Sequence, residues 1–212
     1  MSRVATTADR ARGLRGQAQR GERTRGAIVG AAMEVFAVQG FRASALADIA
    51  ARVGLTPGGI LYHFGSKDAL LLAVIAERDR RAAEMLADLP ISGLESLRGL
   101  MEIARLCERE PGLAALHTIL QVESISPGAP AHRYFLDRSR FVREWLEQVL
   151  VDAQEAGEVG PRVDCAAKAR ELVAFLDGAA GLWLLDRSLS LVDLYESYLA
   201  TFVDVVGSRA DG

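Results

Sequence analysis

The residues best suited to chemistry in this chain form a short segment that begins at Thr56. Thr56 is a helix N-cap residue, and Pro57 suits the first position of a helix predicted over 57–63. Gly58 and Gly59 follow, and each costs a helix about 1 kcal/mol relative to alanine. Bare N–H groups at the positive end of a helix favour phosphate or the wall of a nucleic-acid groove, which would compensate for that cost. The alternative is a tight helix crossing inside the protein.

Polar side chains flank this helix tip. Tyr62 and His63 offer a hydroxyl and an imidazole at its far end. Lys67 falls in the first turn of the next predicted helix, where a cation opposes the helix dipole, so we expect an external anion there. Thr24 and Ser44 stand at predicted helix starts. Together these groups predict contacts to two phosphate backbones, which fix register without reading sequence.

The spacing over residues 46–60 is typical of a helix-turn-helix, in which two helices cross at a short turn. A small fifth residue lets the second helix approach, a glycine at the ninth position provides a left-handed turn, and apolar residues fill the shared core. The residues at these positions are Leu46, Ala50, Val53, Gly54, Leu55 and Ile60. A pair of amphipathic core helices can show the same spacing, so both interpretations stay open at this point.

The charge distribution favours a polyanion partner for the first third of the chain. Residues 1–67 hold ten Lys and Arg against four Asp and Glu, whereas residues 68–212 hold 15 against 24. Lys67 and Lys168 are the two lysines, so the abundance of arginine fits a codon bias and only its distribution is informative. A basic region joined to an acidic one suggests that one end meets nucleic acid.

Helical periodicity dominates the whole chain and predicts an all-α fold. We expect a disordered basic arm over 1–21, either lying along DNA or simply unstructured, a helix-turn-helix DNA-binding domain over 22–67, and a regulatory and dimerisation domain over 68–212. The first helix runs from Glu22 to Gln39 and stops at Gly40. The further helices are predicted over 45–53 with Ser44 as N-cap, 57–63, 67–86 with Ser66 as N-cap, 92–109, 111–125, 130–157, 164–187 and 190–207.

Several classes of protein find no support in the sequence. The longest apolar runs have eight residues, far below the roughly 20 that cross a bilayer, and no secretory signal is recognisable, so we expect a cytoplasmic protein with no membrane partner. Cys107 and Cys165 lack partners at disulfide-framework or zinc-site spacing. No nucleophile, nucleotide-binding or metalloprotease motif occurs, so we expect no enzyme activity, no cofactor and no metal.

The N-terminal motifs resemble the TetR family of bacterial transcriptional regulators. The resemblance rests on Arg23-Thr24-Arg25, Gly40-Phe41, Ala47-Asp48-Ile49-Ala50, Val53-Gly54-Leu55-Thr56 and the run from Gly58 to Leu70. Pro57 stands where the family often has Lys or Arg, and Gly65 where it often has Pro. The first departure removes a potential base contact.

The resemblance implies a ligand-responsive regulator, most often a repressor, that binds a palindromic double-stranded operator as a homodimer and is released by a small-molecule effector. A linking helix over 67–86 would transmit that signal. The predicted DNA-binding residues are Thr24, Ser44, Ala45, Thr56, Pro57, Gly58, Gly59, Leu61, Tyr62, His63 and Lys67. The rival interpretation is a helical ligand-binding or scaffold protein whose helix-turn-helix no longer binds DNA, because the helix tip has no long polar side chain.

The last two predicted helices carry more apolar surface than one intramolecular face uses. Pairing with a second copy in a four-helix bundle would bury this surface, and a twofold axis would set the two recognition helices about 34 Å apart. The predicted interface residues are Leu172, Phe175, Leu176, Ala179, Leu182, Leu191, Leu194, Tyr195, Leu199 and Phe202. The alternative is that this surface packs only within its own domain.

A ligand cavity between the helices of the C-terminal domain is the last expectation. Such cavities are mainly apolar, with a few polar groups that orient the ligand. The candidate lining residues are Met101, Leu106, Cys107, His117, Leu120, Gln121, Phe141, Trp145, Phe175 and Trp183. For each of them ordinary core packing is the alternative, and His117 in its leucine-rich stretch is typical of a core histidine.

Overall fold

The structure is a computed structural model that describes the backbone of residues 3–86 and 93–207, and the side chains of 17–84 and 94–207. The residues described fold into α-helices and one 3-10 helix with no β-strand, which confirms the all-α prediction. The chain forms two compact units, Met1–Glu77 and Arg78–Gly212. The boundary expected after Lys67 falls inside the first unit, because Leu70, Leu71 and Val74 of the following helix are buried.

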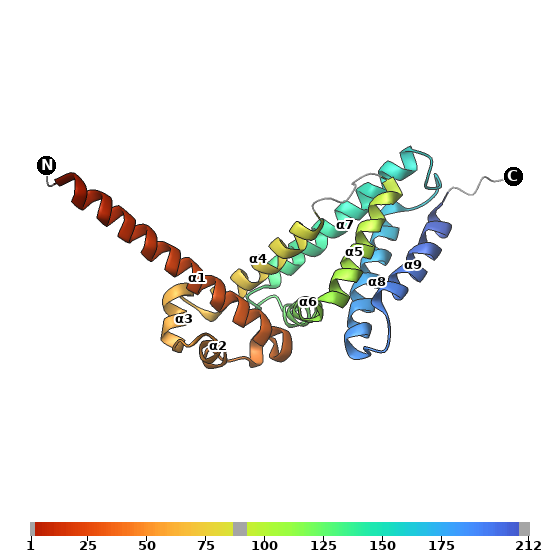
Figure 1. Cartoon of the computed structure of the whole chain (residues 1–212). Coiled ribbons are helices and arrows are strands. Elements are labelled where there is room, and N and C mark those ends of the chain that lie inside the picture. The colour runs from red at the N-terminus through yellow and green to blue at the C-terminus, as the bar shows by residue number, and fades with distance from the viewer. Residues whose placement is uncertain (1–2, 87–92, 208–212) are drawn as a thin grey trace. The chain divides into compact units, whose positions relative to one another are not determined.

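The first unit begins with a long helix, α1 (Arg3–Ala43), which Figure 1 shows running past α2 and α3. Gly40 interrupts the helix with φ at 77°, so the regular part ends where the sequence predicts. The predicted disordered arm is wrong for residues 3–21, which are helical; residues 1 and 2 lie outside the described part. The physical reason is that this stretch contains no proline and extends a helix already nucleated by its buried part.

The helix-turn-helix consists of α2 (Leu46–Val53) and α3 (Pro57–Phe64). Gly54 ends α2 in the left-handed conformation at φ 66°, as the spacing predicts. Thr56 is the N-cap of α3, and its Oγ1 accepts a hydrogen bond from the Gly59 N–H at 3.1 Å. Ile49, Ala50 and Ile60 are buried, so the two helices share one apolar core.

The helix α4 (Lys67–Leu86) has the bounds predicted for it and contributes residues to both units. Ser66 caps it, since the Ala69 N–H donates to Ser66 Oγ at 3.0 Å. Leu70, Leu71, Val74 and Ile75 form an apolar stripe along this helix, and all four are buried. One continuous helix therefore carries the end of the first unit into the start of the second.

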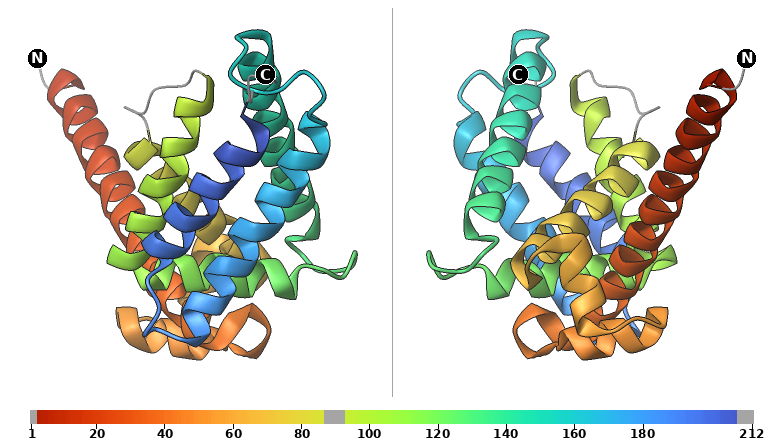
Figure 2. Two further views of the ribbon diagram at one scale, coloured as in Figure 1. Left: turned by 90° about the vertical axis from the view of Figure 1, so that its right-hand side faces the viewer. Right: turned by 90° about the vertical axis from the view of Figure 1, so that its left-hand side faces the viewer.

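The second unit is a bundle in which α8 contacts α6, α7 and α9, and α5 contacts α9. Figure 2 shows α9 between α5 and α8. The bounds are η1 (Gly93–Leu97), α5 (Arg98–Arg109), α6 (Pro111–Glu123), α7 (His132–Glu155), α8 (Cys165–Leu185) and α9 (Leu191–Val206). The single helix expected over 92–109 begins with a 3-10 turn, and residue 92 lies outside the described part. Leu146, Leu150 and Leu172 are fully buried at the centre.

Within the described residues, no single helix is long and apolar enough to cross a membrane. The pair Pro57–Phe64 and Lys67–Glu84 passes the same test together, on length and composition only, and is bent by 67°.

The left-handed turn at Gly54 provides a test of the helix-turn-helix. Gly54→Ala places a Cβ in an unfavourable conformation, so we expect the free energy of unfolding to fall by about 1 kcal/mol. Gly26→Ala is the matched control, because Gly26 lies inside α1 with nothing within 4 Å of a new Cβ. That substitution should raise stability by about 1 kcal/mol. Denaturant titration followed by far-UV circular dichroism measures both, and equal effects of the two variants would contradict the assigned turn.

Candidate functional site

The N-terminal tip of α3 is open to solvent. Thr56, Pro57 and Gly58 are exposed. A Cβ built on Gly58 would meet nothing nearer than Thr56 Oγ1 at 3.8 Å, and one on Gly59 would meet Leu55 and Thr56 at an ordinary 3.6 Å. Packing inside the unit therefore requires neither glycine, and the tight internal crossing that was the alternative explanation is not present.

One face of α3 is buried and the other is exposed. Ile60 and Phe64 point into the core, whereas Tyr62 is 87% exposed and Leu61 is 40% exposed. The His63 ring is half-buried and lies edge-on to the Tyr62 ring, with 5.4 Å between centroids. The exposed face thus offers backbone near Gly58, an apolar contact from Leu61 and a hydroxyl from Tyr62.

Arg25 on α1 holds the C-terminal end of α3 in place. Its Nη1 donates to the His63 carbonyl at 2.5 Å, and its guanidinium lies 4.1 Å from the Phe64 ring centroid. The last carbonyls of a helix lack partners within the helix, so a cation is stabilising there. In the sequence, Arg25 stands out only as part of the family motif. Its position in that motif was the available signal for this positioning role.

Lys67 has partners within its own unit. Its Nζ donates to the carbonyls of Phe41 and Ser44, each at 2.5 Å, and lies 4.5 Å from the Phe41 ring centroid. The ammonium therefore binds backbone of its own unit, and its contact with an external phosphate stays a prediction. The physical reason for the internal contacts is that the helix break at Gly40 leaves carbonyls without helical partners, and these carbonyls need donors.

Ser44 and Thr24 differ from expectation. Ser44 is buried and its Oγ donates to the Phe41 carbonyl at 2.8 Å, so it is not the helix cap that the sequence predicted, and its contact with DNA stays a prediction. Ala45 is the N-cap of α2, and its N–H donates to Asp48 Oδ2 at 3.2 Å. Thr24 lies well inside α1, where its hydroxyl donates to the Arg20 carbonyl at 3.0 Å. Ala45 is exposed, and its contact with DNA stays a prediction.

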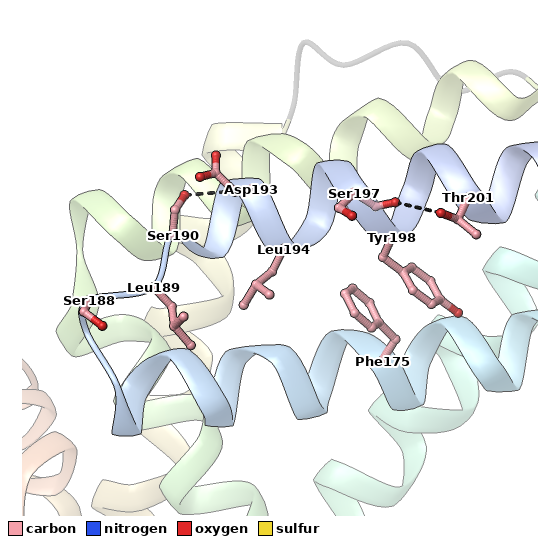
Figure 3. A pocket seen from close by; sticks show the side chains of 9 residues that line it. All are labelled: Phe175, Ser188, Leu189, Ser190, Asp193, Leu194, Ser197, Tyr198 and Thr201. Carbon is pink, nitrogen blue, oxygen red and sulfur yellow. Dashed lines mark hydrogen bonds between the residues drawn. The ribbon is translucent and has the colours of Figure 1, made fainter.

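A groove lies between α8 and α9 in the second unit (Figure 3). The rings of Phe175 and Tyr198 stack across it with 3.7 Å between centroids. Its volume is about 610 Å³, and it is lined by Phe175, Ser188, Leu189, Ser190, Asp193, Leu194, Ser197, Tyr198 and Thr201. Of the ten predicted ligand-lining residues, Phe175 alone borders this groove.

The other predicted ligand-lining residues occupy several environments. Leu106, Leu120 and Trp183 are buried core residues, whereas Phe141 is 67% exposed, so these four do not line one common cavity. The partly buried residues Met101, Cys107 and Trp145 pack against the core of the second unit. Gln121 donates to Asp177 Oδ2 at 2.9 Å. Apolar character in the sequence does not separate a cavity wall from a packed core, which is why the prediction mixed the two.

The dimer prediction is corrected for six residues whose side chains the unit itself buries. These are Leu172, Ala179, Leu191, Tyr195, Leu199 and Phe202. The outward face consists of other positions with helical spacing. On α8, Leu182 and Leu185 are 51% and 89% exposed. Gly178 on the same face has nothing within 4 Å of a new Cβ.

His117 on α6 is partly buried in the second unit, and its Nδ1 atom is shielded from solvent. Its Nδ1 has no hydrogen-bond partner among the described residues, and its ring packs 5.6 Å from the Phe135 ring. Burial lowers the pKa of His117 well below its ordinary value, and the positive charges of Arg78 and Arg138 lower this pKa further. The imidazole is therefore neutral near pH 7. Among the described residues, no group of three or more His, Cys, Asp or Glu is arranged to hold a metal ion.

Comparisons with known proteins agree with this geometry. Residues 28–74, from the middle of α1 to α4, match the model of the bacterial regulatory proteins of the tetR family. The HTH-type transcriptional regulator UidR of Escherichia coli is 30% identical over 152 residues, which are 71% of this chain and 76% of UidR. The chain belongs to the TetR family of helix-turn-helix transcriptional regulators.

Two further similarities cover more than the helix-turn-helix. The A-factor receptor protein of Streptomyces griseus is 29% identical over 154 residues, 71% of this chain and 51% of the receptor. The crystal structure of a TetR transcriptional regulator from Chloroflexus aurantiacus has a TM-score of 0.77 and 24% identity. That likeness covers 91% of this chain and all of the other, so the fold of both units is shared.

The inward position of Lys67 predicts a stability effect. Lys67→Met removes one charged donor from each of two backbone carbonyls, of which the Phe41 carbonyl keeps the Ser44 hydroxyl, so the free energy of unfolding should fall by about 2 kcal/mol. Lys168→Met is the matched control, because Lys168 forms an i,i+3 pair with exposed Glu171 on α8. Its loss should cost less than about 1 kcal/mol. Urea titration measures both variants, and a Lys67→Met protein as stable as the control would mean that the ammonium does not hold the turn.

The buried His117 predicts a pH dependence of stability. Below about pH 6.5 the unfolded chain binds a proton at this residue that the folded chain does not. The free energy of unfolding therefore decreases as the pH is lowered, by up to about 1.4 kcal/mol per pH unit. Above that pH both states are neutral and this contribution is constant. His117→Leu should flatten the slope between pH 6.5 and 5. Denaturant titrations at several pH values measure the slope, and an unchanged slope in His117→Leu would contradict the prediction.

Proposed function

We propose that this protein is a homodimeric repressor that binds a palindromic operator through α3 and is released by a small-molecule effector held in the second unit. The observation that carries the proposal is the tip of α3, where two glycines that internal packing does not require stand beside an 87% exposed tyrosine. Membership of the TetR family makes the chain a transcriptional regulator. The α3 tip is the surface by which such a regulator would reach DNA.

The α3 tip supports close contact with a duplex. The N–H groups before Gly59 and the positive end of the helix dipole suit phosphate, and the absence of side chains at Gly58 lets the backbone approach a groove. Leu61 provides an apolar contact of the kind that packs against a thymine methyl. Arg23 on α1 is exposed and makes no ion pair among the described residues, so it is available to a phosphate.

A second copy of the chain would cover the outward face of α8 and α9. Leu182 and Leu185 stand on one side of α8, and Gly178 leaves room for a close approach of another helix. Such a symmetric bundle buries these leucines and presents two α3 helices to successive turns of DNA. An effector that changed the relation between the two α3 helices would release the operator.

The rival function is that of a helical ligand-binding or scaffold protein. One observation favours it: the Lys67 ammonium is bound to backbone carbonyls and leaves the α3 tip without a long cationic side chain. Electrophoretic mobility shift with the gene's own upstream region separates the two functions. A discrete complex that weakens as salt rises supports the repressor, and an unshifted band at every salt concentration supports the rival.

Gly58 allows stability and DNA binding to be separated. Gly58→Ala should stabilise α3 by up to about 1 kcal/mol, as a helical glycine does when replaced. The added methyl stands at the proposed DNA surface, so operator affinity should fall about tenfold. Gly26→Ala, the matched control, should gain stability and keep its affinity. Fluorescence anisotropy with a labelled operator measures the affinities, and equal affinity of the two variants would place the contact elsewhere.

The dimer is tested by a charge placed on its proposed face. Leu182→Glu combined with Leu185→Glu buries two carboxylates against their symmetry mates, so the dimer dissociation constant should rise at least about a hundredfold. Val38→Glu is the control, because Val38 is 82% exposed on α1. Sedimentation equilibrium should find this control dimeric and the double variant monomeric. Dimers of unchanged affinity in the double variant would exclude this face.

A further inference from the structure

A cluster of charged side chains joins α4 to α7 within the second unit. Arg78 Nη1 lies 2.9 Å from Asp79 Oδ1, and Arg138 Nη1 lies 3.6 Å from the same oxygen. The Tyr134 hydroxyl donates to the other oxygen, Asp79 Oδ2. One carboxylate therefore serves two guanidinium groups and a phenol, and the cluster has an excess of positive charge.

The guanidinium groups have many unused donors. Each arginine carries five N–H donors. Arg78 makes one hydrogen bond, to Asp79, and Arg138 makes none among the described residues. The Arg78 side chain is 17% exposed and that of Arg138 is 33% exposed, so the first is largely shielded from water and the second is partly open to it. Burial lowers the pKa of Arg78, and the charge of Arg138 lowers this pKa further.

His117 adds a further unsatisfied group near Tyr134, because the Phe135 ring packs against the rings of both residues. Its buried Nδ1 has no partner among the described residues, and the charges of Arg78 and Arg138 both act on it.

We propose that Arg78, Arg138, Tyr134 and His117 bind the anionic group of the small-molecule effector, a carboxylate or a phosphate. This inference rests on the proposed function and names the chemistry of its ligand. An oxyanion accepts several of the unused N–H donors at once, and planar guanidinium groups suit both of these anions. The oxyanion also supplies a second negative charge, which Asp79 alone does not provide for the two guanidinium groups. The apolar part of the effector lies against Phe135.

Asp79 competes with the anion, and this competition couples the site to α4. Asp79 lies on α4, whereas Arg138 and Tyr134 lie on α7. An anion that takes over the donors of Arg138 and Tyr134 releases the carboxylate and so loosens the tie between these helices. Since α4 begins at Lys67 in the first unit, a change at Asp79 reaches the DNA-binding unit along one helix. Coupling of this kind is reciprocal, so DNA weakens the anion by the same factor.

Thermal unfolding with matched pairs of compounds tests the site. The pairs are benzoate and benzamide, octanoate and octanamide, and phenyl phosphate and phenol, each at 10 mM with sodium chloride equalising ionic strength. At about ten times its dissociation constant, an anion should raise Tm by about 3 °C and its neutral partner should not. Comparison of the two carboxylate pairs with the phosphate pair shows whether the site prefers a carboxylate or a phosphate. Equal shifts for anion and neutral partner in all three pairs would overturn the proposal.

Two variants locate the effect, and they have opposite signs. Arg138→Gln removes one cation of the cluster and should weaken the anion about tenfold. Asp79→Asn removes the competing carboxylate and should tighten the anion about tenfold. Arg133→Gln is the control, because Arg133 lies on the same helix and pairs with Asp137 away from the cluster. Isothermal titration with the anion of largest Tm shift measures all four proteins. Equal affinities in Arg138→Gln, Asp79→Asn and Arg133→Gln would place the anion elsewhere.

The same proteins separate failure of this site from failure of the proposed function. Anion binding is measured without DNA, and operator binding is measured without the anion. A protein that binds operator but shows no cluster-dependent anion binding overturns the anion site and leaves the repressor intact. A protein that binds the anion through the cluster but never binds DNA overturns the repressor and supports the ligand-binding rival.

Discussion

The arrangement of the first unit depends on how the Lys67 ammonium satisfies the backbone after Gly40. The positive φ of Gly40 ends the regular helix, and the chain turns with its carbonyls unpaired. Lys67 binds the carbonyls of Phe41 and Ser44. Buried carbonyls without donors are costly, so the turn before α2 and the start of α4 are held at one point. Arg25 fixes the end of α3 in the same way, through the His63 carbonyl. The two cations thus position α3 and leave its tip unobstructed.

Local chemistry made much of this unit predictable. Gly40, Gly54 and Thr56 act within a few residues of themselves, and their turn or capping roles follow from residue type and spacing. The internal contacts of Lys67 were not predictable, because its partners are more than twenty residues away in sequence and only the helix dipole could be considered. Ser44 was misjudged for a related reason: the competing acceptor for its hydroxyl, the Phe41 carbonyl, exists only after the helix breaks at Gly40.

The second unit shows where apolar periodicity stops being informative. The predicted bounds of helices α6 to α9 differ from the observed ones by no more than two residues at either end, because proline and glycine separate these helices. Which side of each helix faces inward was not predictable, since α8 and α9 are apolar around much of their circumference. Tyr195 and Leu185 have similar apolar character, yet one is buried and the other is 89% exposed. Burial depends on neighbouring helices, and a single sequence does not specify them.

The charged cluster around Asp79 went unnoticed in the sequence because its members come from different helices. Arg78 and Asp79 are adjacent, but their partners Tyr134 and Arg138 lie on α7 and His117 lies on α6. A helical bundle gains little stability from a buried ion cluster, because desolvation offsets much of the attraction. Retaining two cations around one carboxylate is costlier still. Such an arrangement is reasonable where an additional anion completes the charge balance. Because Asp79 lies on α4, binding of that anion changes the contacts of the helix that enters the DNA-binding unit.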